Sequence, residues 1–340
     1  ENWEKTGRWE AMTDLYTVSD TSGREVALGP THAEIIVPIL KNYVSSYKDL
    51  PLAVYQIQNK FRMELRAKSG ILRGREFMMK DMYSFHTAEK DLSEFYTKMQ
   101  DVYKNIFSRV GIGHITYKTF ASGGTFSKYS HEFQTITPAG EDIIYVDEKS
   151  GVAVNKEVFQ EKVIKDLGLK TEDLKEYRAI EVGNIFELNT KFSKPFDLSF
   201  TDEKGQKHYV LMGCYGIGLG RLLGAIVEAL SDDQGIIWPE NIAPFRVHLL
   251  SFGETGEVKE KAETVYGTLL KNNIEVLFDD REKVSPGEKF ADADLLGMPY
   301  RVVVSERSMK ENGIEIKKRN EKKVKIVSLD ELLKMLKPSA

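Results

Sequence analysis

The amino-acid sequence predicts an α/β protein with an α+β domain over residues 1–243 and a three-layer α/β domain over residues 244–340. In residues 54–86, β-branched and aromatic residues alternate on both sides of a turn, which indicates two antiparallel strands. Beyond Trp238-Pro239, predicted strands and helices alternate, as in domains with helices on both faces of a sheet. The length of 340 residues allows two or three domains, each with its own core.

Composition excludes several classes of protein. The net charge of −4 gives no overall basic field, so any contact with nucleic acid must use a local patch. Cys214 is the one cysteine, which excludes a disulfide framework and a multi-cysteine metal site, and we assign no residue as a metal ligand. Apolar runs are too short to cross a membrane, so we expect no membrane contact and a soluble protein of the cytoplasm or an organelle matrix.

A helix is predicted ahead of the hairpin. Thr31 is followed three residues later by Glu34, the pattern of a capping box, and helical periodicity continues over residues 35–47. Pro38 lies inside this segment, so we expect it to kink or split the helix.

The hairpin carries the first candidate site. Arg62 and Glu64 stand two residues apart, so their side chains point to the same face of a strand. Three arginines and one aromatic residue follow around the turn: Arg66, Arg73, Arg75 and Phe77. An isolated Arg-x-Glu is usually a pair of solvated charges. This cluster instead favours a nucleotide site, because arginine forks bind phosphate and an aromatic ring can stack on a base.

A helix and a polar segment follow the hairpin. Apolar residues at three- and four-residue spacing predict a core helix from Glu89 that Gly111 can close. His131-Glu132 then follows a glycine-rich stretch, where polar residues often line clefts, although an isolated His-Glu pair is more often on the surface. A zinc protease motif is excluded, since Thr135 stands where its second histidine would be.

The second candidate site is a strand that runs through glycines into a helix at residues 210–230. Leu223 stands where a dinucleotide fingerprint needs glycine, and a Walker lysine motif is missing, so both readings are rejected. Arg221 at the helix start is either a surface residue or a group that reaches a polyphosphate or stacks on a base. Before this motif, residues 146–179 are charged and predicted to be mostly helical, as a short connector.

The C-terminal domain contains one local basic run: Lys317, Lys318, Arg319, Lys322, Lys323 and Lys325. Such a run is usually the solvated edge of a hairpin, but it also suits an RNA backbone.

These motifs resemble class II aminoacyl-tRNA synthetases over nearly the whole chain. The Arg62 hairpin is similar to motif 2 of that class, and the strand–helix at residues 213–223 is similar to motif 3. Thr31 and the segments 83–86, 130–133 and 212–218 resemble bacterial-type prolyl-tRNA synthetases in particular. The C-terminal domain is similar to the class IIa anticodon-binding fold, notably at Asp279-Asp280-Arg281 and residues 287–299.

The resemblance implies that proline and ATP, with Mg²⁺, form prolyl-adenylate and that the prolyl group then moves to tRNA(Pro). Arg62 and Arg221 would be catalytic: Arg62 would hold the α-phosphate and the substrate carboxylate, and Arg221 one adenine face and the γ-phosphate. Glu64 would bind the adenine amino group and Phe77 the other adenine face. The implied ATP site is Arg62, Glu64, Arg73, Arg75, Phe77 and Arg221. The implied proline pocket is Thr31, Arg62, Tyr83, His131, Glu132 and Gly216. The implied tRNA contacts are Lys289, Lys317 and Arg319.

Three positions depart from the family pattern near the expected proline pocket. Ala33 stands two residues after Thr31, where the family has an acidic residue. Asn184 stands where a histidine is common, and Asn189 where a glycine is common. Ala33 motivates an alternative function, a synthetase-like tRNA-binding or regulatory paralogue without amino-acid activation.

The extent of the chain gives two further expectations. Motif 1, which contributes to the dimer interface of the family, would precede Glu1, so we expect a fragment that forms a homodimer when motif 1 is present. The large editing domain of many bacterial relatives does not fit into residues 146–179, so we expect no hydrolysis of mischarged tRNA by this chain.

Overall fold

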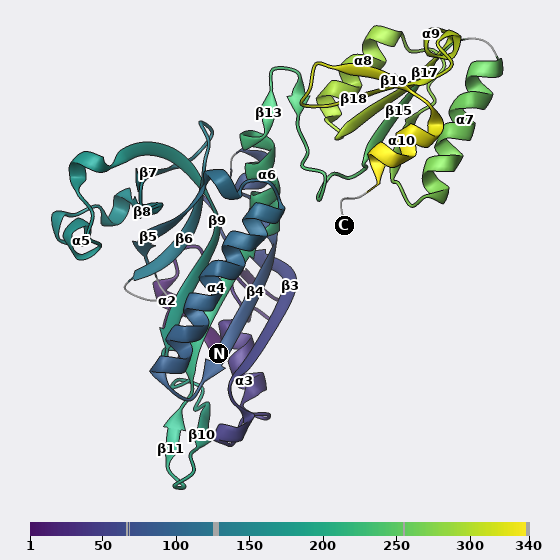
Figure 1. Ribbon diagram of the computed structural model, residues 1–340. Coiled ribbons are helices and arrows are strands. Elements are labelled where there is room, and N and C mark those ends of the chain that lie inside the picture. Colours follow the sequence, from purple (N-terminus) through teal and green to yellow (C-terminus); the bar gives the residue numbers. More distant parts are fainter. Residues whose placement is uncertain (66, 68, 125–128, 254–255, 338–340) are drawn as a thin grey trace. The chain divides into compact units, whose positions relative to one another are not determined.

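The computed structural model describes residues 1–337 except 66, 68, 125–128, 254 and 255, so Arg66 lies outside the described residues (Figure 1). The described part of the chain forms two compact units, Glu1–Ala229 and Leu230–Ala340. Residues 230–243 lie with the second unit, where Nε1 of Trp238 donates a hydrogen bond of 3.0 Å to the carbonyl oxygen of Leu296. The predicted domain boundary after residue 243 stays a prediction.

Within the described residues, the first unit contains an eight-stranded sheet in the order β3-β4-β12-β9-β6-β5-β8-β7. Its strands are β3 (Leu52–Phe61), β4 (Glu76–His86), β5 (Thr116–Ser122), β6 (Tyr129–Ile136), β7 (Asp142–Asp147), β8 (Val152–Asn155), β9 (Lys175–Asn189) and β12 (Leu211–Gly218). The strands pair antiparallel apart from β5 and β8, which are parallel neighbours. The predicted hairpin of residues 54–86 is confirmed as β3–β4, and it forms one side of this sheet.

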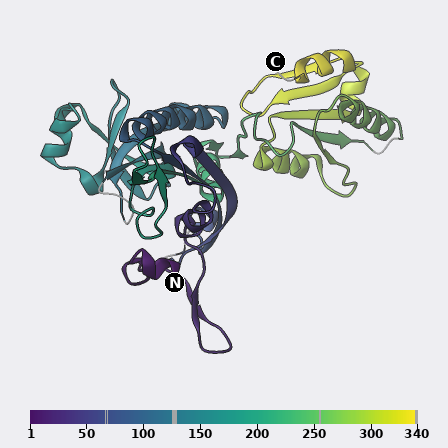
Figure 2. The same ribbon diagram turned by 90° about the horizontal axis from the view of Figure 1, so that it is seen from below.

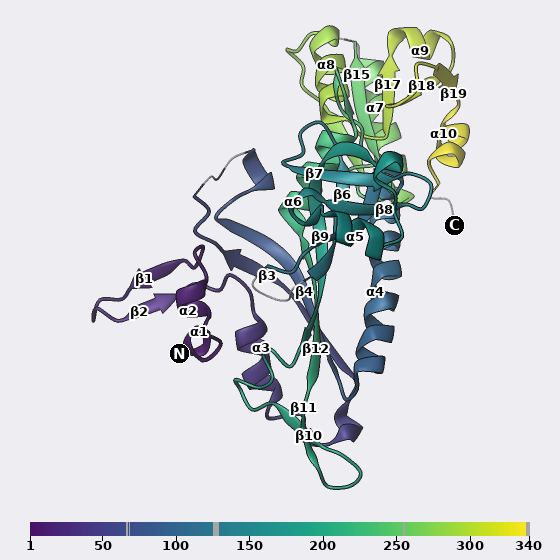
Figure 3. The ribbon, with the colours of Figure 1, turned by 90° about the vertical axis from the view of Figure 1, so that its left-hand side faces the viewer.

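Helices pack on both faces of this sheet. The helices of this unit are α1 (Asn2–Lys5), α2 (Arg8–Ala11), α3 (Ala33–Leu40), α4 (Glu89–Arg109), α5 (Glu161–Asp166) and α6 (Leu219–Ala229). The predicted core helix is confirmed as α4, which runs along β4 and β12 (Figure 3). It buries Tyr103 and Phe107 against Phe133 of β6. On the opposite face α3 packs its buried Val37 in one cluster with Tyr83 and Phe85 of β4.

Short hairpins extend from the first unit. They are β1 (Thr17–Ser19) with β2 (Glu25–Ala27), and β10 (Ser199–Thr201) with β11 (Lys207–Tyr209). Figure 2 shows the β1–β2 hairpin, drawn in purple, projecting from the N-terminal part of this unit.

The predicted capping box at the start of α3 is wrong. Glu34 is fully buried and accepts a hydrogen bond of 2.7 Å from Nη1 of Arg8, and the N-cap of the helix receives no side-chain hydrogen bond. Pro38 lies inside the helix and has no N–H for the carbonyl of Glu34. The side chain of Asn2 donates to that carbonyl at 2.9 Å instead. Glu34 therefore joins the N-terminal segment to α3.

The connector at residues 146–179 also differs from its prediction. It is not mostly helical, because Val152–Asn155 form β8 between β5 and β7, and the long β9 begins at Lys175. The helix of this region, α5, spans Glu161–Asp166. Ala153 and Val154 are fully buried on opposite sides of β8, which explains why an apolar strand forms in a charged segment.

The second unit has, in its described residues, a five-stranded sheet in the order β16-β15-β17-β18-β19. Its strands are β15 (Val247–Phe252), β16 (Val276–Asp279), β17 (Tyr300–Ser305), β18 (Ile314–Lys318) and β19 (Val324–Val327), preceded by β13 (Ser231–Asp232) and β14 (Gly235–Ile236). Its helices are α7 (Gly256–Lys271), α8 (Pro286–Leu296), α9 (Glu306–Lys310) and α10 (Leu329–Leu336). Val265 of α7 and Leu332 of α10 pack on one face of the sheet and Ala293 of α8 on the other, so the three-layer α/β prediction is confirmed.

Candidate active site

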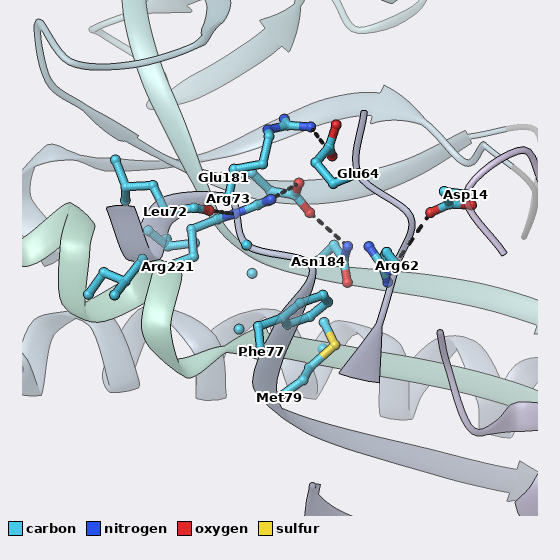
Figure 4. A pocket seen from close by; sticks show the side chains of 16 residues that line it. Asp14, Arg62, Glu64, Leu72, Arg73, Phe77, Met79, Glu181, Asn184 and Arg221 are labelled. Atoms are coloured by element: carbon cyan, nitrogen blue, oxygen red, sulfur yellow. Dashed lines mark hydrogen bonds and ion pairs between the residues drawn. The ribbon is translucent and has the colours of Figure 1, made fainter. Parts of the chain in front are cut away.

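A pocket of about 210 Å³ lies over the first unit's sheet, between the β3–β4 turn, β9 and the start of α6 (Figure 4). The structure brings together in its lining six of the residues predicted from the sequence: Arg62, Glu64, Arg73, Phe77, Gly216 and Arg221. It adds the polar side chains of Asp14, Glu181 and Asn184. The two motifs that the sequence placed far apart thus meet at one cavity.

Arg62 points into this cavity from the end of β3. Its Nε donates to the carbonyl of Pro30 at 3.3 Å and lies 4.0 Å from Oδ2 of Asp14. Its guanidinium carbon lies 5.3 Å from the centre of the Phe77 ring, within the range of a cation–π contact. Arg62 and Phe77 therefore offer a cation and an aromatic face side by side.

The arginines of the turn hold Glu64. Nη1 of Arg73 donates to Oε2 of Glu64 at 3.0 Å, and its Nε donates to Oε2 of Glu141 at 2.8 Å. Nε of Arg75 donates to the backbone carbonyl of Glu64 at 3.0 Å, but Arg75 is exposed and does not line the pocket. In the structure Arg75 supports the turn rather than the cavity wall.

Arg221 enters from the first turn of α6. Its Nε donates to the carbonyl of Leu72 at 3.0 Å, and its Nη1 donates to Oε2 of Glu181 at 3.1 Å (Figure 4). The glycine-rich strand end and helix start thus bring a cation to the cavity, where Phe77 already offers its ring.

The floor of the cavity lies on a row of directly opposed residues that crosses the sheet. From β3 to β6 the row is Gln56, Asp81, Gly216, Asn184 and Glu132, and of these Gly216 and Asn184 line the cavity. Directly opposite residues share one face of a sheet, so this row lies on the face away from α4. A Cβ atom at Gly216 would lie only 2.8 Å from Cε of Met79 and 2.9 Å from Oδ1 of Asn184. A side chain there would force Met79 or Asn184 to move, whereas glycine leaves bare backbone as the floor.

Thr31 and Tyr83 lie together but are buried. Their hydroxyl oxygens are 3.4 Å apart, and the backbone N–H of His32 donates to Oη of Tyr83 at 3.2 Å. Ala33 is fully buried in the cluster that contains Tyr83. Because Glu34 pairs with Arg8, neither position 33 nor position 34 presents a carboxylate to the cavity.

His131 and Glu132 point to opposite faces because they are neighbours on β6. Nδ1 of His131 lies 2.8 Å from Oη of Tyr96 on α4, and burial lowers the pKa of this histidine to about 4. Glu132 lies on the cavity's side of the sheet and accepts hydrogen bonds from Gln134 at 2.9 Å and Asn155 at 3.2 Å. Burial, reinforced by the Glu181 carboxylate, raises the pKa of Glu132 to about 8. The structure therefore brings Glu132, but not His131, towards the cavity.

Two of the three predicted tRNA contacts are buried in ion pairs. Nζ of Lys289 donates to the carbonyl of Asp279 at 3.0 Å and lies 3.5 Å from its carboxylate. Arg319 donates to both carboxylate oxygens of Asp232, at 2.8 and 2.6 Å, and its Nε donates to the carbonyl of Asp294 at 2.9 Å. These contacts stabilise the second unit and leave little of either charge for RNA. Lys317 is half-buried on β18.

Neither a metal site nor a membrane helix emerges from the described residues. Among them, no group of three or more His, Cys, Asp or Glu side chains is placed to hold a metal ion. The helices described in the structure are all too short or too polar to span a membrane.

A largely antiparallel sheet with Arg62 and Glu64 on one hairpin and Arg221 on a strand–helix turn, together with a separate α/β unit, is the arrangement of a class II aminoacyl-tRNA synthetase. Residues 16–230 match the family described as tRNA synthetase class II core domain (G, H, P, S and T), and residues 245–338 match the anticodon binding domain. The chain belongs to the class II tRNA synthetases, and its relatives place it with the proline–tRNA ligases.

Two relatives illustrate this placement. A proline–tRNA ligase from Anaplasma phagocytophilum is 37% identical over 347 residues, which cover 97% of this chain and 80% of that protein. A proline–tRNA ligase from Persephonella marina is 31% identical, with 98% of this chain and 85% of that protein covered. The second alignment spans 482 positions against 340 residues here, so that relative carries a long segment that this chain lacks.

The fold is that of solved prolyl-tRNA synthetases. The structure of the enzyme from Giardia lamblia in complex with prolyl-adenylate superposes with a TM-score of 0.78 at 20% identity. The superposition covers 98% of this chain and 63% of the Giardia chain, so this chain spans less than two thirds of that protein.

Proposed function

We propose that this chain activates proline with ATP to form prolyl-adenylate and pyrophosphate, and then transfers the prolyl group to tRNA(Pro). The observation that carries this proposal is the convergence of Arg62, Glu64, Phe77 and Arg221, from two distant motifs, on one cavity. The family of the chain supports the same function.

Activation needs alignment and charge neutralisation rather than a protein acid or base. A carboxylate oxygen of proline attacks the α-phosphorus of ATP, and the bond to the bridging oxygen of pyrophosphate breaks. In our proposal Arg62 holds the two anionic reactants together, while Phe77 and Arg221 bind the adenine ring and Arg221 also binds the γ-phosphate. Such fixed cations stabilise the charge of the transition state in a site already organised before the reaction.

Mg²⁺ is proposed to arrive as its ATP complex. The cavity's carboxylates at Glu64 and Glu181 are each held by an arginine, and the described residues contain no three-ligand cage. Mg²⁺ commonly keeps several waters and binds through phosphate oxygens of the nucleotide, which suits such a cavity. We therefore assign the ion to ATP and water and no residue to a metal site.

Contacts with tRNA are proposed for the second unit. Lys322, Lys323 and Lys325 are exposed beside the half-buried Lys317, around the turn between β18 and β19. Lysines at such a turn can neutralise phosphates of an RNA backbone, and binding should weaken as salt is added. A homodimer and a cytoplasmic location belong to the same proposal, by analogy with the family.

Charging of tRNA(Pro) with labelled proline tests the proposed function. We expect prolyl-tRNA from this chain with proline and much less product with alanine at equal concentration. A second candidate, a regulatory paralogue that binds tRNA without activation, is favoured by Ala33, whose side chain is fully buried. Binding of tRNA(Pro) without any charging would favour that candidate and contradict our proposal.

A further inference from the structure

A β-bulge in β9 places Glu181 on the face of the cavity. In the pairing of β6 with β9, Phe133 lies opposite Gly183 but Gln134 lies opposite Glu181, so Val182 is an extra residue. In a regular strand, residues 181 and 184 would point to opposite faces because they are three apart. Bulges re-aim side chains and occur often beside active sites. Here the bulge lets both Glu181 and Asn184 line the cavity (Figure 4).

The two side chains form a chain of hydrogen bonds that ends at Arg221. Nδ2 of Asn184 donates to Oε1 of Glu181 at 2.7 Å, and Oε2 of Glu181 accepts from Nη1 of Arg221 at 3.1 Å. The carbonyl of Leu72 accepts from Nε of Arg221 at 3.0 Å. The guanidinium is therefore held at two of its three nitrogens, and among the described residues none accepts from its Nη2, which is left for a ligand.

Gly216 makes the position of Asn184 possible. A Cβ atom at residue 216 would lie 2.9 Å from Oδ1 of Asn184, so any larger residue would displace the amide. With glycine there, the amide lies beside the bare floor and its Nδ2 can face Glu181. Gly216 and the bulge at Val182 thus together allow the Asn184 amide to donate its hydrogen bond to the Glu181 carboxylate.

The ion pair between Arg221 and Glu181 is partly exposed to solvent, which argues against a role only in the stability of the fold. The Arg221 and Glu181 side chains are 30% and 23% exposed, and ion pairs with this much solvent contact contribute little to folding. The hydrogen bonds matter more for the orientation of Arg221, because a guanidinium that is already held at two nitrogens loses less conformational entropy when it binds phosphate.

We propose that Glu181 and Asn184 are positioning residues that orient Arg221 for ATP. This inference rests on the proposed function, because it takes ATP as the ligand of Arg221. It assigns a role to two residues that act through Arg221 and not through direct contact with the reacting atoms.

The first test is the affinity of the ATP site without proline or tRNA, measured by calorimetry with the ATP analogue AMPPNP, which has no co-substrate to react with under these conditions. We expect Asn184→Ala and Glu181→Gln each to weaken binding by about tenfold, the scale of one hydrogen bond to a charged group. In pyrophosphate exchange, KM for ATP should rise by a similar factor and KM for proline by less than about twofold. Asn59→Ala is the matched control: Nδ2 of Asn59 donates to Oε1 of Glu76 at 2.8 Å on an exposed part of β3, so its removal should change neither constant.

The second test asks whether Asn184 acts through Arg221. In an Arg221→Ala background, Asn184→Ala should cause no further loss of AMPPNP affinity, since there is no guanidinium left to orient. The same tenfold loss in that background would show a direct contact with the nucleotide and overturn the inference, as would unchanged affinity in the single variants. These affinities are measured without proline. A failure of proline activation would therefore contradict the proposed function, but the AMPPNP affinities of the variants would still test whether Glu181 and Asn184 orient Arg221.

Discussion

The polar residues of the cavity are held by partners from distant parts of the chain. Arg221 is fixed by the carbonyl of Leu72 and by Glu181, and Arg73 by Glu64 and Glu141. Interactions that are formed on folding do not have to be ordered again when a ligand arrives. The cavity is therefore organised for anionic groups before substrate binds.

Glu132 gives a pH prediction at this scale. Its pKa is raised from 4.5 to about 8, chiefly by burial, so between these values the folded state holds a proton that the unfolded state has released. Stability should therefore fall as pH rises from about 5 to about 8, because the native state binds more protons there. Glu132→Gln should remove part of this fall. Urea unfolding of both proteins at several pH values measures it, and an identical pH dependence in the variant would contradict the assignment.

Single residues differ in how visible they are in the sequence. Arg62, Glu64, Phe77 and Arg221 stand in local motifs, and the structure brings all four to one cavity. Glu181 gives a weaker signal, one of several charged residues in β9, and its orientation depends on a bulge against β6. The separation of His131 from Glu132 follows from the two-residue period of a strand.

At the scale of elements, the apolar periodicity of a segment predicts those strands and helices whose formation depends mainly on their own residues. The β3–β4 hairpin and α4 each carry their own pattern of apolar residues, and both were predicted. By contrast β8 is four residues long in a charged segment and exists because β5 and β7 pair with it. The start of α3 likewise depends on Arg8, which lies in the separate helix α2 and donates a hydrogen bond to Glu34. Neither pairing is visible from neighbours in sequence.

The bare floor of β12 makes a prediction for this element. Gly216→Ala should lower proline-dependent pyrophosphate exchange by at least about tenfold. The new methyl group would lie 2.8 Å from Cε of Met79 and 2.9 Å from Oδ1 of Asn184, so both side chains would have to move. Gly220→Ala is the control, since its Cβ would meet the carbonyl of Ile71 at an ordinary 3.5 Å. That variant should keep its activity and its stability. Equal exchange rates for the two variants would show that the floor is not sensitive to a methyl group.

At the scale of the whole molecule, the sequence predicted two domains of the right classes, because each domain keeps its own apolar pattern. The boundary after residue 243 stays a prediction; in the structure residues 230–237 pack with the second unit, where Asp232 accepts hydrogen bonds from Arg319, nearly ninety positions further along the chain. The basic run that contains Arg319 suggested an RNA contact, which stays a prediction, and the structure shows Arg319 paired with Asp232.

Loss of this ion pair should loosen the start of the second unit. Arg319→Ala removes the hydrogen bonds to Asp232 and to the carbonyl of Asp294, so backbone amides of residues 230–237 should exchange with solvent faster. Hydrogen–deuterium exchange on the full chain measures this, with Arg307→Ala as the control because that side chain is 83% exposed in its pair with Glu311. Unchanged protection of residues 230–237 would refute the structural role.

Proline-dependent exchange of pyrophosphate into ATP, measured without tRNA on this chain and on Arg221→Ala, tests the central claim most directly. We predict exchange with proline and far less with alanine, and a loss of at least about a hundredfold in Arg221→Ala without a change in its melting temperature. Wild-type activity retained by Arg221→Ala would remove this residue from the reaction. An absence of proline-dependent exchange in the unaltered chain, with tRNA(Pro) still bound, would contradict the account as a whole.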